Sequence, residues 1–187
     1  MKELNSEAVH ASRGRSFYLR LPILIYLAYV FIGHLSSFNF KSILYPLTVG
    51  MYELGYFTFS WMGEFIGVLG AVVFQLGTPI VAIFTCYFLG DFFALFFSFG
   101  WLSTSLFLIA RYVTDAYAAG LPLIGPFSER NIVRDWNYFL IQAGLLPHAR
   151  FIAVISKIMA CAAMLICLIG GAWFLRQAKK NSLKAEG

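Results

Sequence analysis

Charged residues are scarce in this chain: 12% of its 187 residues are Asp, Glu, Lys or Arg, whereas 60% are hydrophobic. Soluble globular domains contain about 25% charged residues. The deficit excludes an ordinary water-soluble fold, because a chain of this size cannot bury so much apolar surface away from water. Lipid is the alternative solvent, and apolar runs of about 18 residues or more with few charges predict membrane-spanning helices.

Cysteine and histidine are also scarce, with three of each. Cys161 and Cys167 do not have the two-to-four-residue spacing of a zinc ribbon, and the cysteines are interpreted as small packing residues in apolar runs. The histidines, His10, His34 and His148, stand far apart, so no pair has the spacing of two ligands on one helix. No metal or cofactor is therefore predicted.

The net charge of +5 is unevenly distributed along the sequence. Basic residues concentrate outside the first and last apolar runs, which places both termini on the cytoplasmic side by the positive-inside rule. No basic and aromatic face typical of nucleic-acid binding is visible. The flanking basic residues are Lys2, Arg13, Arg15, Arg20, Arg176, Lys179, Lys180 and Lys184.

The apolar runs predict an all-α, polytopic membrane helix bundle, with about four transmembrane helices and one short membrane-embedded segment. No Ala-x-Ala-like site follows the first run, so it is interpreted as a retained anchor. Two cytoplasmic termini require an even number of crossings, which four spans satisfy; five or six crossings stay open. The predicted parts are a cytoplasmic tail at 1–20, a helical domain at 21–175 with spans at 21–37, 65–89, 92–114 and 151–175, an embedded segment at 43–59, a non-cytoplasmic loop at 117–150, and a basic tail at 176–187.

A few ionisable residues fall at membrane depth, where a charge costs roughly 2.5–3.5 kcal/mol on insertion scales and indicates a functional site. Arg111 and Asp115 are four residues apart on one helix face and predict an ion pair. Glu53 is flanked by apolar residues on both sides, and Arg134 in the long loop is a candidate partner for it.

Glu53 also belongs to a short motif, Tyr-Glu-Leu-Gly-Tyr at 52–56. His-Glu-x-x-His on a helix binds zinc, because its two imidazoles lie one turn apart beside a general-base carboxylate. Here the spacing and the glutamate are present, but Tyr52 and Tyr56 occupy the histidine positions.

Several other motifs follow in a fixed order: Gly63-Glu64-Phe65, Phe74-Gln75-Leu76 with Pro79, Asp115-Ala116, Leu121-Pro122-Leu123-Ile124-Gly125 and Asp135-Trp136-Asn137-Tyr138. In this order the chain resembles small bacterial multi-pass membrane proteins that are similar to site-2-type intramembrane zinc metalloproteases. The resemblance covers roughly residues 50 to 155. It implies residence in the bacterial inner membrane.

The resemblance also implies that the zinc ligands have been replaced. Tyr52 and Tyr56 stand at the positions of the two helix histidines, and Arg134 stands at that of a histidine before Asp-Trp. A phenol with a pKa near 10 must lose a proton to bind zinc, and a guanidinium is always protonated. Glu53 is then a vestigial catalytic residue, and Asp115 a weaker correspondence. The replaced side chains predict a metal-free cluster of Tyr52, Glu53, Tyr56, Asp115 and Arg134.

Three functions follow from these observations. The first is a catalytically inactive relative of an intramembrane metalloprotease that binds a membrane protein or peptide within the lipid bilayer. The second is a small transporter, channel or accessory subunit, because the segment around Pro46 and Gly50 is broken and carries an acid at depth. The third is an active metal-dependent protease whose remodelled site uses Glu53, Glu64 and Asp115 as oxygen ligands.

Overall fold

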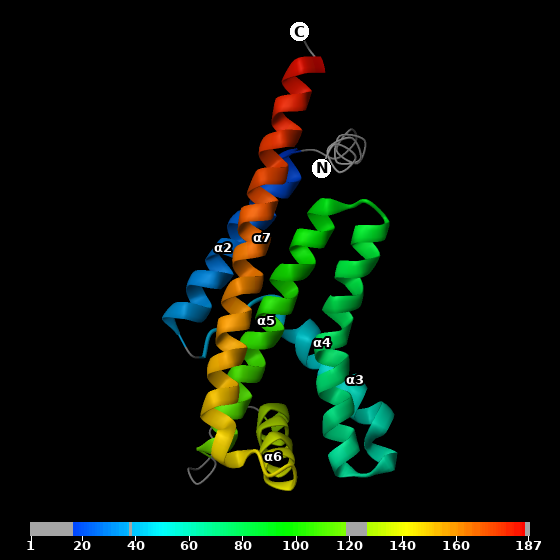
Figure 1. The fold of residues 1–187 in the computed structure, drawn as a ribbon, viewed down its shortest axis with the longest axis vertical. Helices are drawn as coiled ribbons and strands as arrows, with labels where there is room; N and C mark the ends of the chain where they lie inside the picture. The colour runs from blue at the N-terminus through cyan, green and yellow to red at the C-terminus, as the bar shows by residue number, and fades with distance from the viewer. Residues whose placement is uncertain (1–16, 38, 119–126, 186–187) are drawn as a thin grey trace. The chain divides into compact units, whose positions relative to one another are not determined.

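The computed structural model describes residues 17–37, 39–118 and 127–185. No strand occurs within these ranges, and the prediction of an all-α fold is confirmed (Figure 1). The elements are the α-helices α2 (Phe17–Ser36), α3 (Tyr45–Phe59), α4 (Glu64–Phe88), α5 (Phe92–Tyr117), α6 (Phe127–Gln142) and α7 (Ala149–Ala185), and the short 3-10 helices η1 (Ser60–Met62) and η2 (Leu146–His148).

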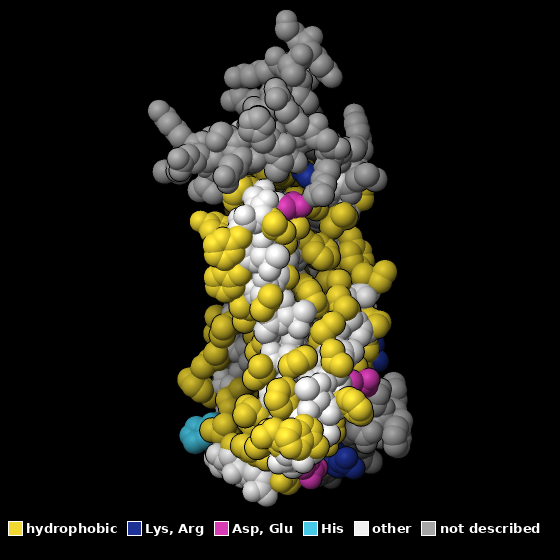
Figure 2. Space-filling model, turned by 90° about the vertical axis from the view of Figure 1, so that its right-hand side faces the viewer, with side chains coloured by type: hydrophobic (Ala, Val, Ile, Leu, Met, Phe, Trp, Pro, Cys, Tyr) yellow, Lys and Arg dark blue, Asp and Glu magenta, His cyan; other side chains and the backbone are white. Residues whose placement is uncertain are grey.

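Three apolar segments in the described residues are long enough to cross a membrane: Glu64–Phe88, Phe92–Tyr117 and Leu146–Gln177. They coincide with three of the predicted spans. Hydrophobic side chains are spread along the described part of the face in Figure 2, as expected for helices in contact with lipid. The chain thus has the helices of an integral membrane protein. The first predicted span, 21–37, coincides with α2, whose described apolar part, Arg20–Ser36, is shorter, so its crossing stays a prediction.

The loop predicted at 117–150 differs most from its expectation, because it contains α6. Glycine and proline in this connection cluster before residue 127 and after residue 143, which leaves the stretch between them free of helix breakers. That stretch is polar overall, so no apolar run indicates the helix, but its apolar residues lie on one helix face. The tail predicted from residue 176 also differs, since α7 continues to Ala185.

The chain forms two compact units. Unit 1 comprises the described residues of Met1–Phe40, Pro79–Leu102 and Cys161–Gly187, and unit 2 comprises Lys41–Thr78 and Ser103–Ala160. Helices α4, α5 and α7 each contribute one part to each unit. Every residue of the predicted cluster belongs to unit 2.

In unit 1, glycines permit close packing of α2, α5 and α7, as small residues do between membrane helices. A Cβ at Gly100 would lie 3.1 Å from the Cys167 sulfur, and one at Gly171 would lie 2.8 Å from a methyl of Leu24. Arg20, at the start of α2, is buried. Its guanidinium carbon lies 5.3 Å from the ring centres of both Phe93 and Phe174, so a cation is held between aromatic rings of α5 and α7.

In unit 2, α3 and η1 turn into α4 at Gly63, whose φ of 113° favours glycine. Side-chain hydrogen bonds then connect the longer helices. Gln75 Nε2 donates to the Ser105 carbonyl at 3.4 Å, and Ser103 Oγ donates to the Ala160 carbonyl at 2.7 Å. The buried cluster of this unit contains Tyr52, Ala71, Leu108, Ile109, Tyr112, Val113, Ala116, Ile132, Val133, Trp136, Leu140, Ala149 and Ala153.

Candidate functional site

Helix α3 turns one tyrosine of the motif into the core of unit 2 and its glutamate away from it. The Tyr52 side chain is 2% exposed, whereas Glu53 is exposed and Tyr56 is half-buried. Successive residues of an α-helix are rotated by about 100°, so the buried face of α3 includes Tyr52 but not Glu53. Gly55 explains how α3 approaches α4, because a Cβ there would lie 2.6 Å from the Gly70 carbonyl oxygen.

Helix α6 supplies the second half of the site. Asn137 Nδ2 donates a hydrogen bond to the Ala116 carbonyl at 2.7 Å, and the Phe139 ring stacks on Phe65 with 5.1 Å between ring centres. These contacts fix α6 against α5 and α4, and bury Asp135 and Trp136. Arg134 remains outside: its side chain is 67% exposed, and its Nη2 lies 3.7 Å from Asp135 Oδ1.

The charges around Asp135 show which side chains lie near one another. Burial raises the pKa of Asp135 from 3.8 to about 6, the Arg134 guanidinium lowers it, and the Glu64 carboxylate raises it. Burial, Asp135 and Glu64 raise the pKa of Tyr56, and burial together with Asp135 and Tyr56 raises that of Tyr52. The side chains of Tyr52, Tyr56, Glu64 and Arg134 therefore each interact electrostatically with Asp135. We call these five residues the tyrosine–aspartate cluster.

The structure brings Tyr52, Tyr56 and Arg134 of the predicted site together but places the two acids elsewhere. Glu53 is exposed on α3, and the ion-pair partner of Arg134 is Asp135 rather than Glu53. Asp135 was not among the predicted cluster residues. The sequence signal for Asp135 was its position between Arg134 and Trp136. An acid within the apolar face of a helix is buried together with that face.

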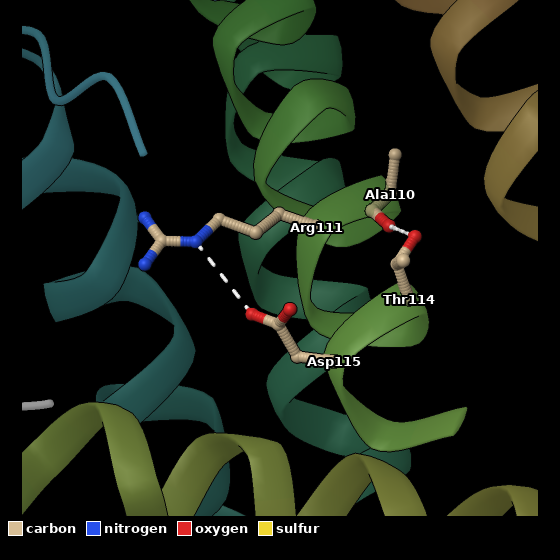
Figure 3. A network of polar contacts seen from close by, with 4 residues as sticks. All are labelled: Ala110, Arg111, Thr114 and Asp115. Carbon is tan, nitrogen blue, oxygen red and sulfur yellow. Dashed lines mark hydrogen bonds and ion pairs between the residues drawn. The ribbon is translucent and has the colours of Figure 1, made fainter. Parts of the chain in front are cut away.

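Asp115 lies with Arg111 on α5, as the spacing predicts. Arg111 Nε is 3.7 Å from Asp115 Oδ2, and both side chains project from the same side of the helix, away from Thr114 (Figure 3). Thr114 Oγ1 donates to the Ala110 carbonyl at 2.7 Å. The pair is largely shielded from solvent, with side chains 13% and 31% exposed.

The cluster offers hydrogen-bond donors and one buried carboxylate. The Tyr52 hydroxyl and the Trp136 indole N–H are buried, and neither finds a hydrogen-bond partner among the described residues. A buried polar group left in this way costs about 1–3 kcal/mol. A phenol with a raised pKa stays protonated at neutral pH, so the site can donate hydrogen bonds. Its two carboxyl groups, Asp135 and Glu64, are fewer than the three or four anionic or imidazole ligands of a zinc site.

Within the described ranges, no three His, Cys, Asp or Glu side chains come together as a metal site. In comparisons with protein families, curated proteins and solved structures, nothing matches this chain. The evidence for function therefore consists of the chain's own residues and the order of its motifs.

Proposed function

We propose that this chain is a catalytically inactive relative of site-2-type intramembrane metalloproteases, and that its tyrosine–aspartate cluster binds a membrane protein or peptide. One observation carries the proposal. Tyr52 and Tyr56 on α3 and Arg134 on α6, the three positions where the resemblance places zinc ligands, all interact electrostatically with one carboxylate, Asp135. Residues 78 positions apart in the sequence have no local reason to meet in this way.

The chemistry of the cluster favours binding over hydrolysis. Zinc hydrolases need a metal to activate water, and here two neutral phenols and a guanidinium stand at the ligand positions. Glu53 is turned outward and has no activated water to deprotonate. Tyr56, which is half-buried, and the exposed Arg134 are instead suited to donate hydrogen bonds to a carbonyl oxygen of a bound segment.

The alternative with a carboxylate-bound metal has less support. Its three proposed ligands have different surroundings. Glu53 is exposed, Asp115 pairs with Arg111, and Glu64 interacts electrostatically with Asp135. The proposed location is the bacterial inner membrane, with four crossings and both termini in the cytoplasm if α2 crosses as predicted.

Restoring the histidines tests the proposed ancestry. We expect purified wild-type protein to contain no stoichiometric zinc, and the variant Tyr52→His/Tyr56→His/Arg134→His to bind about one zinc per chain, because three imidazoles complete a zinc site. Elemental analysis after dialysis gives the zinc content. The matched control is Glu53→His/Phe57→His, which has the same four-residue spacing on the outward face of α3. Stoichiometric zinc in the wild type, or a folded triple variant that binds no more than the control, contradicts the proposal.

Photo-crosslinking in native membranes tests the proposed binding. A photoreactive phenylalanine in place of Tyr56 is expected to form an adduct of discrete mass with a protein or peptide. Asp135→Ala should lower the yield of that adduct by removing the carboxylate at the centre of the cluster. The same analogue in place of Tyr29, an exposed ring in unit 1, serves as the control. Equal adducts at both positions would mean that the cluster has no special role in binding.

A further inference from the structure

The outward face of α3 carries an apolar seam with the spacing of a helix–helix contact. Leu47, Gly50, Leu54 and Phe57 follow one another at intervals of three, four and three residues, and all are exposed. This alternation is the spacing by which one helix packs knobs into holes of another. The spacing places the four residues on one face of α3.

Gly50 makes this seam suited to close contact. No atom lies within 4 Å of a Cβ built on it, so the space beside it is open within the described structure. Small residues at membrane interfaces allow two backbones to approach, and glycine is the smallest. A glycine in a helix otherwise costs about 1 kcal/mol relative to alanine, and nothing within the described part of unit 2 uses its small size.

Glu53 flanks the seam and is also exposed. A charged carboxylate on an apolar helix face at membrane depth is costly unless a basic group faces it. A partner of α3 should therefore present both an apolar stripe and a cation.

Helix α7 of this same chain presents that combination in unit 2. Phe151, Val154 and Ile158 are exposed at intervals of three and four residues, with relative exposures of 64%, 54% and 63%, and Lys157 beside them is exposed. Tyr52, next to Glu53, and Ala153, about one turn before Lys157, both belong to the buried cluster of unit 2.

We propose that α3 is a docking surface for α7 of a second copy of this chain, with Glu53 facing the second copy's lysine at position 157. The two surfaces differ, so the contact is head-to-tail and the pair of copies keeps one unused surface of each kind. Repetition by rotation about the membrane normal then produces a closed ring or an open chain. The proposal does not depend on whether the tyrosine–aspartate cluster binds a partner.

Disulfide crosslinking between two tagged copies tests the contact. In a background with Cys86, Cys161 and Cys167 replaced by alanine, Leu54→Cys in one copy and Ile158→Cys in the other should form a disulfide-linked dimer in membranes. Two copies that both carry Leu54→Cys should form little of it, because α3 does not meet α3. Absence of the mixed dimer overturns the proposal, as does a mixed dimer no more abundant than the one between identical copies.

Charge reversal then tests the pair at the centre of the contact. Glu53→Lys in the first copy should reduce the mixed dimer to background, and adding Lys157→Glu in the second copy should restore it. Restoration shows that both variants fold. Gly50→Leu should likewise remove the dimer, whereas Gly77→Leu, at an open helical glycine of α4, should leave it unchanged. A dimer insensitive to charge reversal, or a double reversal without recovery, overturns the proposal.

Discussion

Replacing Gly55 with alanine should unfold unit 2 at a clearly lower denaturant concentration than the wild type. The added Cβ would lie 2.6 Å from the Gly70 carbonyl oxygen and 2.8 Å from the Ala71 Cα. Both are backbone atoms of α4, which cannot rotate aside as a flexible side chain would. Forcing extra atoms into a packed interior costs typically about 1–3 kcal/mol, and the rigid obstacle places this change at the upper end.

The loss of stability in the Gly55→Ala variant should extend beyond the contact between α3 and α4. Separation of the two helices would uncover Tyr52, which is nearly fully buried between them and the rest of the cluster. Denaturation in detergent micelles, followed by circular dichroism and tryptophan fluorescence, measures the change in unfolding free energy.

Gly77→Ala is the matched control for this substitution. Gly77 lies in α4 with no atom within 4 Å of an added Cβ, so alanine there should be neutral or stabilising by up to about 1 kcal/mol. Equal unfolding midpoints for the Gly55 and Gly77 variants would refute the close approach of α3 and α4.

Replacing Asp135 with asparagine should stabilise unit 2 at neutral pH. Burial raises the pKa of this carboxyl from 3.8 to about 6, so the folded state holds its proton more tightly than the unfolded state. The protonated Asp135 carboxyl therefore contributes its full stabilisation of the folded state below about pH 4. This contribution falls as the pH rises toward 6 and is absent above it. Over this interval, the free energy of unfolding should fall by up to about 3 kcal/mol.

Asparagine keeps the shape of the side chain and removes the charge. The Asp135→Asn variant should therefore show a higher unfolding free energy than the wild type at pH 7, by about 1–3 kcal/mol, and a flatter profile between pH 4 and 7. Glu64 on α4 adds to the effect, since two carboxylates near each other raise the cost of ionising both.

Asp91→Asn provides the control for the aspartate series. Asp91 Oδ1 accepts a hydrogen bond from the Ala94 N–H at the start of α5, and asparagine caps a helix about as well as aspartate. This variant should leave the unfolding free energy at pH 7 close to the wild-type value. A lower stability of Asp135→Asn at pH 7 would mean instead that the ion pair with Arg134 outweighs the cost of burying the charge.

The fold could be predicted from the sequence where lipid imposes a simple requirement. The ends of α4 and α5 lie close to those of the apolar runs, because a spanning helix must keep charged residues outside the hydrocarbon. Helix α6 could not be found in this way. It is polar on one side, and its pattern becomes informative only when the apolar side has something to pack against.

The site was predictable in part. The order of the motifs connected Tyr52 and Tyr56 with Arg134, although no physical rule fixes contacts between such distant segments. The orientation of α3 could not be derived, since Tyr52 and Glu53 are neighbours and the sequence does not say which of them faces the core. Asp135 was missed for the same reason: Arg134 attracted attention as a replaced ligand, but it points outward, and its neighbour is the buried residue.

The aromatic enclosure of Arg20 has a consequence for biosynthesis. The two rings come from α5 and α7, so Arg20, in the first turn of α2, obtains the Phe174 ring only when α7 has been made. About 150 residues separate Arg20 from Phe174, and ribosomes add about 5–20 residues per second, so the wait is roughly 8 to 30 seconds. During that time, the Arg20 guanidinium lacks the Phe174 ring.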